Sequence, residues 1–483
     1  MHIHILGICG TFMGGLAALA RELGHEVSGA DRAAWPPMST RLRELGIEPV
    51  VGFESEQLDA KPDLVLVGNV MSRGMPIVEA LLDSGIDYFS GPEWLGRQVL
   101  PGREVITVAG THGKTTTSGM VAWLLQEAGL EPGFLIGGEP GNFNRTARLG
   151  SGRHFIIEGD EYDTAFFDKN AKFLHYRART VIINNIEHDH ADIYAGLDAV
   201  LRQFHLLLRR TPGGARLIIN GADANIAKLL EQGCWSTVER FSVGASTDAD
   251  WRAERVDGLR ARFACASGEA EGVVELPGPH NLSNALAAVA AAHGAGVDLE
   301  DACAALGSFR PPARRLQFIG RYGAGSDIVL YDDFAHHPTA IRVTLEALKQ
   351  DHARVLAVFE PASNSMRSGA HLEGLPAALG EAEHAWLAPS GSLEWDPEAE
   401  FAGVEHVTPC ADAAEATQAV AASAQPGDAV VFMSNSGASG GAQLLAGALS
   451  ASLGSEGMTL AASPPSAQAR RLRSRVEGEG RHR

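Results

Sequence analysis

Cysteine is scarce in this sequence, and its spacing excludes a common class of small structural site. The 483 residues include five cysteines, and no two of them form a CxxC pair. This pattern excludes a zinc ribbon and argues against a disulfide framework, as expected in a reducing compartment. The five are Cys9, Cys234, Cys265, Cys303 and Cys410.

Long hydrophobic runs are also missing. No window of the sequence reaches the roughly 18 uninterrupted apolar residues that a membrane-spanning helix needs. The first ten residues, MHIHILGICG, lack the basic stretch and long apolar core of a secretory signal. We therefore expect a soluble, cytoplasmic protein with no membrane partner.

Basic residues are outnumbered by acidic ones. The chain has 40 Lys and Arg against 59 Asp and Glu, a formal net charge of −19. An acidic chain repels phosphate backbones, so we expect no nucleic-acid partner, although local sites for small phosphates stay open. Only six of the basic residues are lysines, which makes a lysine inside a motif more notable.

What is present is a globular composition, with 45% hydrophobic residues, on a chain long enough for several domains. Apolar runs alternate with helical patterns, which is typical of βαβ units around a parallel sheet. The predicted strands are His2–Leu6, His25–Ala30, Leu64–Gly68, Glu104–Ala109, Phe155–Ile157, Thr180–Asn184, Ile328–Tyr331, Val355–Phe359 and Ala429–Met433. The predicted helices include Met13–Leu23, Thr115–Ala128 and Asn284–His293.

Two breaks divide this pattern, at Pro101-Gly102 and at the paired prolines 311–312. After residue 456 the sequence is rich in Arg, Ser, Pro and Gly and has no apolar period, which is typical of a disordered tail. We therefore predict an α/β protein with three domains, 1–101, 102–310 and 311–456, and a tail at 457–483.

The strongest motif is VITVAGTHGKTTT, which begins at Val105. It places a strand before a glycine-rich turn, then Lys-Thr and a helix, so that backbone N–H groups and the helix N-terminus can bind phosphate. Lys114 is expected to reach the β- and γ-phosphates, and the Thr115 hydroxyl to hold Mg²⁺. Val108 stands where the usual P-loop has its first glycine, so this is the short form G-x-x-G-K-T. The alternative is a plain βα turn with a chance Gly-Lys, but the combined pattern predicts an ATP site made by Gly110, Thr111, His112, Gly113, Lys114, Thr115 and Thr116.

Two acidic strand ends follow. Glu158 ends one predicted strand, and the cluster at 187–192, EHDHAD, follows another. Ligands bind outside the carboxyl ends of strands in α/β sheets, so both groups are expected to face the phosphates. A carboxylate and a neutral imidazole can ligate a second Mg²⁺, whose charge offsets repulsion between an incoming anion and the γ-phosphate. A solvated acidic loop is the alternative, and a zinc site from residues 188–190 is disfavoured because adjacent residues rarely converge on one ion.

The N-terminal loop, GICGTFMGG at residues 7–15, is similar to a dinucleotide fingerprint, with Asp31 after the second strand. Cys9 occupies the second glycine position, so the match is incomplete. A phosphate-binding turn with Asp31 beside a ribose hydroxyl is one interpretation, and a purely structural glycine turn is the other.

Two later clusters are ambiguous from spacing alone. His280-Asn281 opens a helix, where Asn281 could be only a cap. The segment DDFAHHP follows a strand, and its His336 could be only a packed loop residue.

These motifs, in this order, resemble the Mur ligase family, the ATP-dependent amide-bond-forming enzymes of peptidoglycan synthesis. The resemblance extends to about residue 450: GTHGKTTT is similar to the family's nucleotide loop, and the neighbourhoods of Asn281, Arg315 and Asp333 to its later motifs. The stretches LGICGTFMGG, VGNVMSRG, SGPEWL, PGNFN, EGDEYDTAFFDK and YDDFAHHPTAI are most similar to one branch. That branch joins UDP-N-acetylmuramate to the peptide L-alanyl-γ-D-glutamyl-meso-diaminopimelate during murein recycling.

The resemblance implies a Rossmann-like N-terminal domain for the UDP-sugar, a central P-loop ATPase domain and a Rossmann-like C-terminal domain for the peptide. It also implies that the muramoyl carboxylate attacks the γ-phosphate, giving an acyl phosphate and ADP, before the peptide amine attacks the activated carbonyl. Phosphoryl transfer of this kind depends on positioning and charge neutralisation more than on a protein nucleophile.

The residue roles that the resemblance implies fall into three sets. Lys114 and Thr115 would hold the phosphates and Mg²⁺, and Glu158 and His190 the second ion. The nucleotide set is completed by Asn281, Arg315 and Asp333. The substrate set is Gly10, Thr11, Phe12, Met13, Asp31, Asn69 and Arg73 around the UDP moiety, with His336 and Arg367 in the C-terminal domain. The resemblance leaves the oligomeric state open, and we expect a monomer.

Two departures from the family pattern bear on these roles. Some family members carry a carbamylated lysine, but no lysine lies between Lys172 and Lys228 here, and His205 stands at that place. We therefore predict no carbamate. Ala362 stands where peptide-adding members usually have Arg, and Arg367 is the residue that could compensate.

Three rival functions follow from the same residues. The first is ligation of free L-alanine by a member of the same family, which would differ only in its amine preference. The second is a nicotinamide-dependent oxidoreductase that uses the N-terminal turn. The third is a nucleotide-binding regulator that binds ATP without turnover.

Overall fold

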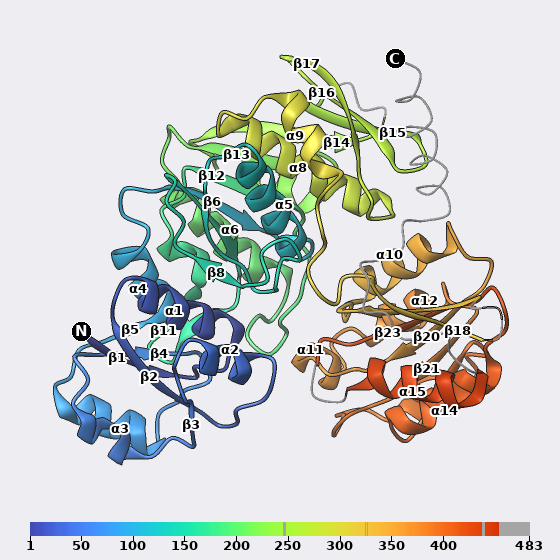
Figure 1. The fold of residues 1–483 in the computed structure, drawn as a ribbon, viewed down its shortest axis with the longest axis horizontal. Helices are drawn as coiled ribbons and strands as arrows, with labels where there is room; N and C mark the ends of the chain where they lie inside the picture. The colour runs from blue at the N-terminus through green and yellow to red at the C-terminus, as the bar shows by residue number, and fades with distance from the viewer. Residues whose placement is uncertain (245–247, 324, 326, 437–439, 454–483) are drawn as a thin grey trace.

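The computed structural model describes residues 1–244, 248–323, 325, 327–436 and 440–453. Within them the chain forms three successive α/β units, drawn in Figure 1 from blue through green and yellow to red. The units are built on sheets of five, ten and six strands, and a two-stranded sheet pairs β10 (Asp163–Ala165) with β11 (Asp168–Ala171). The predicted α/β class with three domains is confirmed. The tail predicted at 457–483 lies outside the described residues.

The first sheet is parallel throughout, in the order β3-β2-β1-β4-β5. The chain leaves β1 in one direction to build β2 and β3 and later returns to add β4 and β5 on the other side. This reversal between β1 and β4 is the place where sheets of this kind bind ligands. The strands are β1 (His2–Leu6), β2 (Glu26–Asp31), β3 (Val50–Val51), β4 (Leu64–Val67) and β5 (Tyr88–Ser90), and the α-helices are α1 (Thr11–Glu22), α2 (Met38–Glu44), α3 (Pro76–Ser84) and α4 (Gly91–Gln98).

The second sheet has β6 (Glu104–Ala109) near its middle, between β9 (His154–Gly159) and β12 (Thr180–Ile183). These strands are parallel, so their carboxyl ends share one edge. The other strands are β7 (Gly133–Leu135), β8 (Ala147–Arg148), β13 (Arg216–Asn220), β14 (Thr237–Val243), β15 (Trp251–Asp257), β16 (Arg260–Cys265) and β17 (Gly268–Val273). Its α-helices are α5 (Lys114–Glu127), α6 (Leu197–Arg210), α7 (Ala224–Glu231), α8 (Pro279–Gly294) and α9 (Leu299–Leu306).

Helix α5 is buried along almost its whole length, from Thr115 to Leu125. It packs against α8, whose buried stretch from Ala285 to Ala292 consists mainly of alanine. Small side chains let the two helix backbones approach closely, and an interior packed at this density leaves little room for the helices to move. Helix α5 is therefore held firmly behind the loop that precedes it.

The third sheet has the order β18-β19-β23-β20-β21-β22, and all its pairs except the first are parallel. The strands are β18 (Gln317–Tyr322), β19 (Ile328–Asp333), β20 (Val355–Phe359), β21 (His384–Leu387), β22 (Val407–Pro409) and β23 (Ala429–Met433). The α-helices are α10 (Pro338–Lys349), α11 (Asn364–Arg367), α12 (Leu375–Leu379), α13 (Pro397–Glu400), α14 (Ala413–Ser423) and α15 (Gly441–Leu453).

The first and second units touch through a glycine on α1. A β-carbon on Gly15 would lie 2.3 Å from Leu135 Cδ1, so a larger residue would separate the two units. Gly14 is restricted in the same way by the Met38 sulfur, 2.4 Å from its β-carbon position. Packing therefore explains this glycine pair of the N-terminal motif, which lies on α1 and not in the preceding turn, and the role of the turn stays a prediction.

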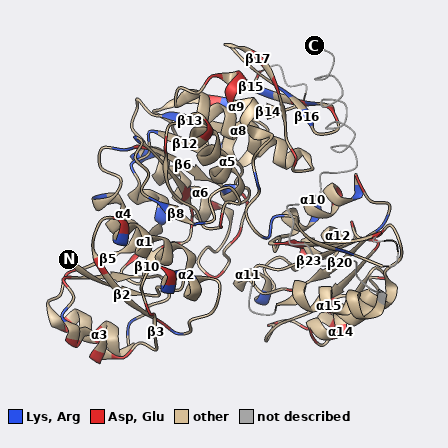
Figure 2. Ribbon diagram, in the orientation of Figure 1, with Lys and Arg blue, Asp and Glu red and all other residues tan. Residues whose placement is uncertain are grey.

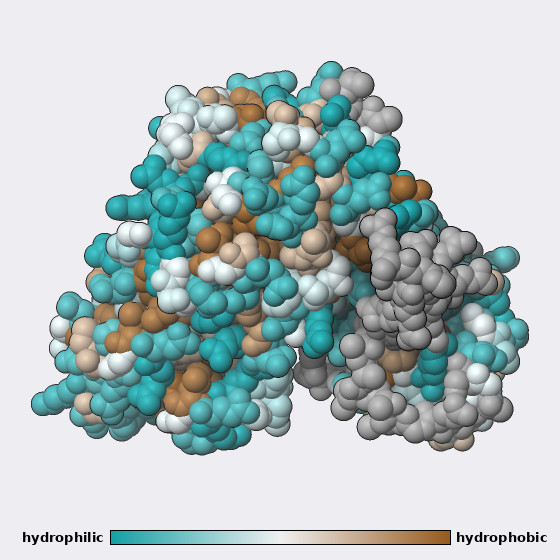
Figure 3. Space-filling view, turned by 45° about the horizontal axis from the view of Figure 1, so that its top comes forward, coloured by the Kyte–Doolittle hydropathy of each residue, from teal (hydrophilic) through white to brown (hydrophobic). Residues whose placement is uncertain are grey.

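The surface is mixed in charge and polarity. Figure 2 shows acidic and basic residues interspersed over all three units of the described chain. The space-filling view in Figure 3 shows a mainly hydrophilic face with a notch between the N-terminal and C-terminal units. Among the described residues, no helix has the length and apolarity needed to cross a bilayer. All five cysteines are free, which confirms the prediction that they form no disulfide framework.

Candidate active site

The glycine-rich turn joins β6 to α5 at the carboxyl edge of the second sheet. Gly110 and Gly113 have φ angles of 128° and 81°, conformations that favour glycine. A β-carbon on Gly113 would also lie 2.4 Å from Asn284 Oδ1 on α8. Helix α5 begins without a side-chain cap and without an acidic residue in its first turn, so its first N–H groups are available to an anion.

Lys114 lies beneath this turn. Its ammonium group donates to the carbonyl oxygens of Gly110 (2.7 Å) and Thr111 (3.3 Å) and to Glu161 Oε2 (2.9 Å). Burial alone would lower the pKa of Lys114, but the charges of Glu161 and Asp160 outweigh it and raise the pKa. Lys114 therefore remains a cation beside the expected phosphate position.

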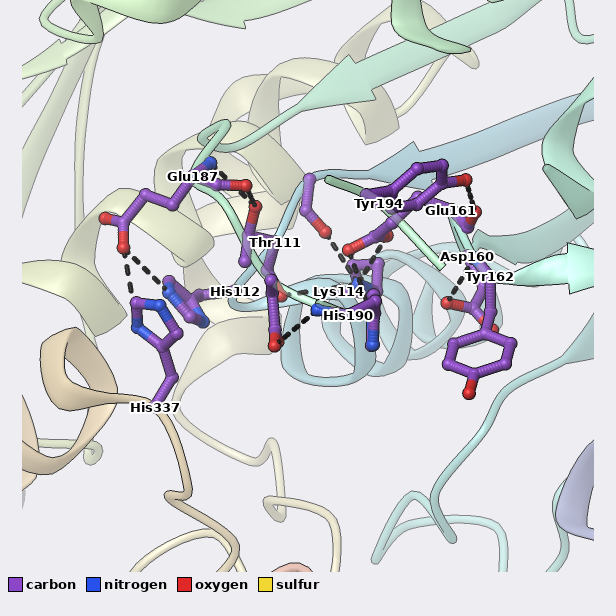
Figure 4. A network of polar contacts seen from close by, with 12 residues as sticks. Thr111, His112, Lys114, Asp160, Glu161, Tyr162, Glu187, His190, Tyr194 and His337 are labelled. Carbon is purple, nitrogen blue, oxygen red and sulfur yellow. Dashed lines mark hydrogen bonds and ion pairs between the residues drawn. The ribbon is translucent and has the colours of Figure 1, made fainter. Parts of the chain in front are cut away.

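A second cluster joins Lys114 to the strand ends. Asp160, Glu161 and His190 each offer one ligand atom, and these three atoms lie within 4.8 Å of one another. His190 Nε2 is 3.5 Å from Glu161 Oε1, and Lys172 donates to Asp160 Oδ2 across 2.6 Å. Figure 4 shows Glu161 next to Lys114 and His190.

The carboxylates of this cluster are held ionised. Burial would raise the pKa of Glu161, but Lys114 and His190 outweigh it and lower the pKa. Burial would lower the pKa of His190, yet Glu161 outweighs it and raises that pKa to about 9. A cation that takes the place of the His190 proton would therefore meet two negative charges at once.

Glu158 lies on a different side of the turn. Its Oε1 accepts from the backbone N–H of Gly137 across 2.9 Å, and burial raises its pKa although Lys114 and Arg315 lie nearby. Glu158 is in neither of the two potential metal-ligand triads among the described residues. Asp160 and Glu161 were not predicted as candidate ligands from the sequence, although both belong to the same EGDE segment as Glu158.

The third unit reaches into this site through Arg315. Its Nη2 lies 3.4 Å from Thr115 Oγ1, and its guanidinium lies over the Phe334 ring, 4.8 Å from the centroid. Asp333 is buried behind it and accepts from the backbone N–H groups of Leu316 (2.6 Å) and Ala335 (2.8 Å). Burial lowers the pKa of Arg315 and raises that of Asp333. The opposite charge of each residue offsets part of this effect on the other.

A pocket of about 250 Å³ opens beside the cluster, between the second and third units. Contacts across it join Asn364 Nδ2 to Asp192 Oδ2 (2.9 Å) and the Ser365 hydroxyl to Asp189 Oδ1 (3.2 Å). The pocket is lined by Tyr162, Asp189, His190 and Asp192 on one side and by His336, Ala362, Ser363, Asn364, Ser365 and Asn435 on the other.

Three family models match the chain in the order of these units. They are described as "Mur ligase family, catalytic domain" at residues 2–101, "Mur ligase middle domain" at 108–292 and "Mur ligase, glutamate ligase domain" at 314–436. The chain belongs to the Mur ligase family. The predicted resemblance to this family is confirmed.

Individual Mur ligases are similar over most of the chain. The UDP-N-acetylmuramate--L-alanyl-gamma-D-glutamyl-meso-2,6-diaminoheptandioate ligase of Escherichia coli (strain K12) is 48% identical over 91% of this chain and 96% of its own length. A solved murein peptide ligase from Psychrobacter arcticus 273-4 is 41% identical, with a TM-score of 0.74, and the match covers 95% of this chain and all of that one. The UDP-N-acetylmuramate--L-alanine ligase of Gloeobacter violaceus is 35% identical over 79% of each chain.

The nucleotide residues predicted for this Mur ligase lie around one loop, and Asn281 lies behind it. Asn281 is buried on α8, where its side chain bonds to Pro277 O (2.8 Å) and receives a bond from Asn284 (3.3 Å). Asn284, which was not predicted as a site residue, is the one that faces Gly113. Its position three residues after Asn281, on the same face of a helix, was the signal available in the sequence.

The predicted UDP-sugar residues lie around the end of β1. Gly10 and Thr11 are exposed there, Phe12 is half-buried and Met13 is buried. Asp31 bonds to the backbone N–H groups of Cys9 (2.8 Å) and Arg32 (2.7 Å), so it also holds the loop in shape.

The remaining substrate residues are more scattered. Asn69 is exposed on the loop after β4, while Arg73 pairs with Glu79 at 3.0 Å on the surface. His336 lines the pocket, and Arg367 on α11 does not. These assignments stay predictions.

Proposed function

We propose that this Mur ligase joins the carboxylate of UDP-N-acetylmuramate to the amine of L-alanyl-γ-D-glutamyl-meso-diaminopimelate at the expense of ATP. The observation that carries this proposal is the 48% identity, over nearly the full length of both chains, to the E. coli ligase named for this peptide. The relative named for L-alanine is less similar and matches over a smaller share of the chain.

The nucleotide loop fits the phosphates of ATP. The uncapped start of α5 offers N–H groups, and Lys114 adds a positive charge below them. Arg315 adds a second positive charge from the third unit, beside Thr115. These groups stabilise the charge that accumulates on the phosphoryl oxygens during transfer, where positioning and neutralisation supply most of the catalysis.

The residues present also fit Mg²⁺. Thr115 and Glu158 would hold one ion and Asp160, Glu161 and His190 another, because the first set offers two oxygen ligands and the second offers two carboxylates and an imidazole next to the loop. Mg²⁺ bound here supplies charge neutralisation between the phosphates and the muramoyl carboxylate. The ion pairs of Lys114 and Lys172 keep Glu161 and Asp160 ionised and oriented toward that position.

The amine is expected in the pocket between the second and third units. His336 Nδ1 is 2.9 Å from the carbonyl oxygen of Phe334, which makes Nδ1 the donor and leaves Nε2 as an acceptor. Burial lowers the pKa of His336 to about 4, so the ring is neutral near pH 7. Nε2 can therefore accept a hydrogen bond from the neutral amine and orient it for attack on the acyl phosphate, which forms the C–N bond and releases phosphate.

Ligation of L-alanine is the second candidate, and Ala362 is the observation that favours it. This residue lines the pocket where an arginine would offer a guanidinium to the carboxylates of a peptide. A pocket without that group discriminates less strongly in favour of an anionic peptide.

ADP release separates the two candidates. The protein is incubated with UDP-N-acetylmuramate, ATP and Mg²⁺ and with either the tripeptide or L-alanine. We expect turnover with the tripeptide; turnover with L-alanine alone would replace the proposal by the second candidate. Absence of turnover with either amine, in a protein that binds ATP, would favour a regulator.

We further propose that the reaction takes place in the cytoplasm, on a monomer divided near residues 101 and 310. The five free cysteines agree with a reducing compartment. Sedimentation of the purified chain tests the monomer, and limited proteolysis tests the two boundaries.

A further inference from the structure

A cluster that the proposed reaction does not use lies on the other side of the nucleotide loop. His112 comes from the loop, Glu187 from the segment after β12, and His337 from the residue that precedes α10. Figure 4 shows these three side chains turned toward one another, with Lys114 and His190 beyond the loop. The cluster therefore joins the second unit to the third.

The spacing within the cluster is that of ligands around one small ion. Glu187 Oε2 lies 3.3 Å from His112 Nε2 and 3.5 Å from His337 Nδ1, and the three atoms lie within 4.8 Å of one another. Tetrahedral ligands about 2.0–2.1 Å from Zn²⁺ are about 3.3–3.4 Å apart. Two of the three edges thus match a tetrahedral site without rearrangement.

The hydrogen bonds of His337 indicate which of its nitrogens would bind an ion. The Thr339 backbone N–H donates to His337 Nδ1 across 3.3 Å, and His337 Nε2 lies 3.4 Å from the carbonyl oxygen of His188. The ring is therefore the tautomer with its proton on Nε2 and a lone pair on Nδ1. That lone pair lies 3.5 Å from Glu187 Oε2, and an ion bound between the two atoms would take the place of the long bond from the Thr339 N–H.

Burial strengthens this argument. His337 is only 7% exposed, so water contributes little to screening the contact between its lone pair and the carboxylate. Glu187 Oε2 already accepts the Thr339 hydroxyl at 2.7 Å, which fixes the direction of the carboxylate.

We propose that His112, Glu187 and His337 form a binding site for a divalent transition-metal ion, with Zn²⁺ the best match. Two imidazoles and one carboxylate suit Zn²⁺ and its neighbours in the first row better than Mg²⁺, which prefers oxygen ligands. A water or a substrate oxygen would complete the four ligands.

The site would connect metal binding to the arrangement of the domains. Its ligands come from both the second and the third unit, so the ion binds with full affinity only when these units are together. By mass action, the ion then stabilises this arrangement.

Binding of Co²⁺ to the full-length protein tests the proposal, because tetrahedral Co²⁺ has a strong visible spectrum. The titration is done with excess Mg²⁺, and Zn²⁺ is then added to displace Co²⁺. We expect one tetrahedral Co²⁺ per chain, a loss of affinity of roughly tenfold or more in Glu187→Gln and His337→Asn, and displacement by Zn²⁺. Glu187→Gln keeps an acceptor for the Thr339 hydroxyl, and His337→Asn keeps one for the Thr339 backbone N–H. We therefore expect both variants to keep the helix cap and the fold.

Two further variants locate the ion. His371→Asn changes a neighbouring imidazole, whose ring centroid lies 4.5 Å from that of His337, and is expected to bind Co²⁺ like the wild type. His190→Ala removes a ligand of the other cluster and is expected to keep the spectrum. Unchanged affinity in Glu187→Gln and His337→Asn, or loss of the spectrum in His190→Ala, would overturn the proposal. A thermal midpoint that Zn²⁺ raises in the wild type but not in Glu187→Gln would support it independently of the spectrum.

Discussion

Arg315 lies 3.4 Å from the Thr115 hydroxyl, although 200 positions of sequence separate the two residues. This contact joins the third unit to the first turn of α5, so the phosphate site is complete only when the units are together.

Replacement of Arg315 by Lys tests this contact. Lysine keeps the charge but lacks the planar fork, and we expect kcat/KM for ATP to fall by roughly tenfold or more. The exposed Arg310→Ala variant of the adjoining segment is the control and should retain wild-type kinetics. Equal activity of Arg315→Lys and wild type would remove Arg315 from the site.

Lys114 is expected to have separable roles in catalysis and stability. Lys114→Ala should abolish ADP release, and it should also lower the free energy of unfolding by roughly 1–3 kcal/mol because it leaves His190 as the one cation paired with the buried Glu161 carboxylate. The double variant Lys114→Ala/Glu161→Gln should regain most of that stability without regaining activity. Urea titration and the ADP assay measure the two effects, and retained turnover in the single variant would contradict the assignment.

The Asp160 carboxylate is expected to set the Mg²⁺ requirement. Asp160→Asn removes a negative ligand from the second cluster, so the Mg²⁺ concentration for half-maximal ADP release should rise by about tenfold. Asp163→Asn, three residues further along, changes a carboxylate paired with Lys169 outside the cluster and is the matched control. If the two variants need the same Mg²⁺ concentration for half-maximal ADP release, Asp160 is not a ligand.

Ala362 is expected to limit recognition of the peptide. Ala362→Arg places a guanidinium in the pocket, and the KM for the tripeptide should fall by roughly 3- to 10-fold through pairing with its carboxylates. The KM for ATP should not change. An increase in the tripeptide KM would mean that the pocket holds a different part of the substrate.

His4 is expected to make stability depend on pH. It is buried on β1, 4% exposed, and burial lowers its pKa from 6.5 to about 4. Between these values the unfolded chain binds a proton that the folded chain does not, so acidification reduces the free energy of unfolding by up to about 3 kcal/mol. Above pH 6.5 this contribution is constant.

His4→Asn keeps a polar group near Ser28 without a titrating ring. Urea midpoints of wild type and His4→Asn at pH 7.5 and pH 5 measure the difference between them. The wild type should lose more stability on acidification, and an equal loss in both proteins would contradict the prediction.

Nine strands, among them β1, β6 and β23, could be predicted from the sequence, because buried parallel strands are continuous apolar runs with polar residues at both ends. Others, such as β13 and β21, were not predicted. Helix starts were less accurate. The helix predicted from Asn284 begins at Pro279, since proline suits the first turn of a helix. Short pairs such as β10 with β11 have no such pattern and were not predicted.

The nucleotide loop could be predicted because its chemistry is local to one stretch of chain. The division of roles among Glu158, Asp160 and Glu161 could not, since it depends on which way each carboxylate points after β9. The cluster at His112, Glu187 and His337 could not be predicted either, because its members come from three separate segments that meet only in the folded chain.

The close packing of α5 against α8 limits which parts of the enzyme can change position during a catalytic cycle. A helix enclosed along its length cannot slide or tilt without opening a void. We therefore expect Lys114 and the phosphate-binding turn to keep their position relative to the second sheet. We then expect the third unit, which carries Arg315 and His336, to be the part that moves relative to the nucleotide when substrates bind and leave. We expect any hinge motion in the short connections on either side of the second unit, where it would open and close the pocket between the second and third units.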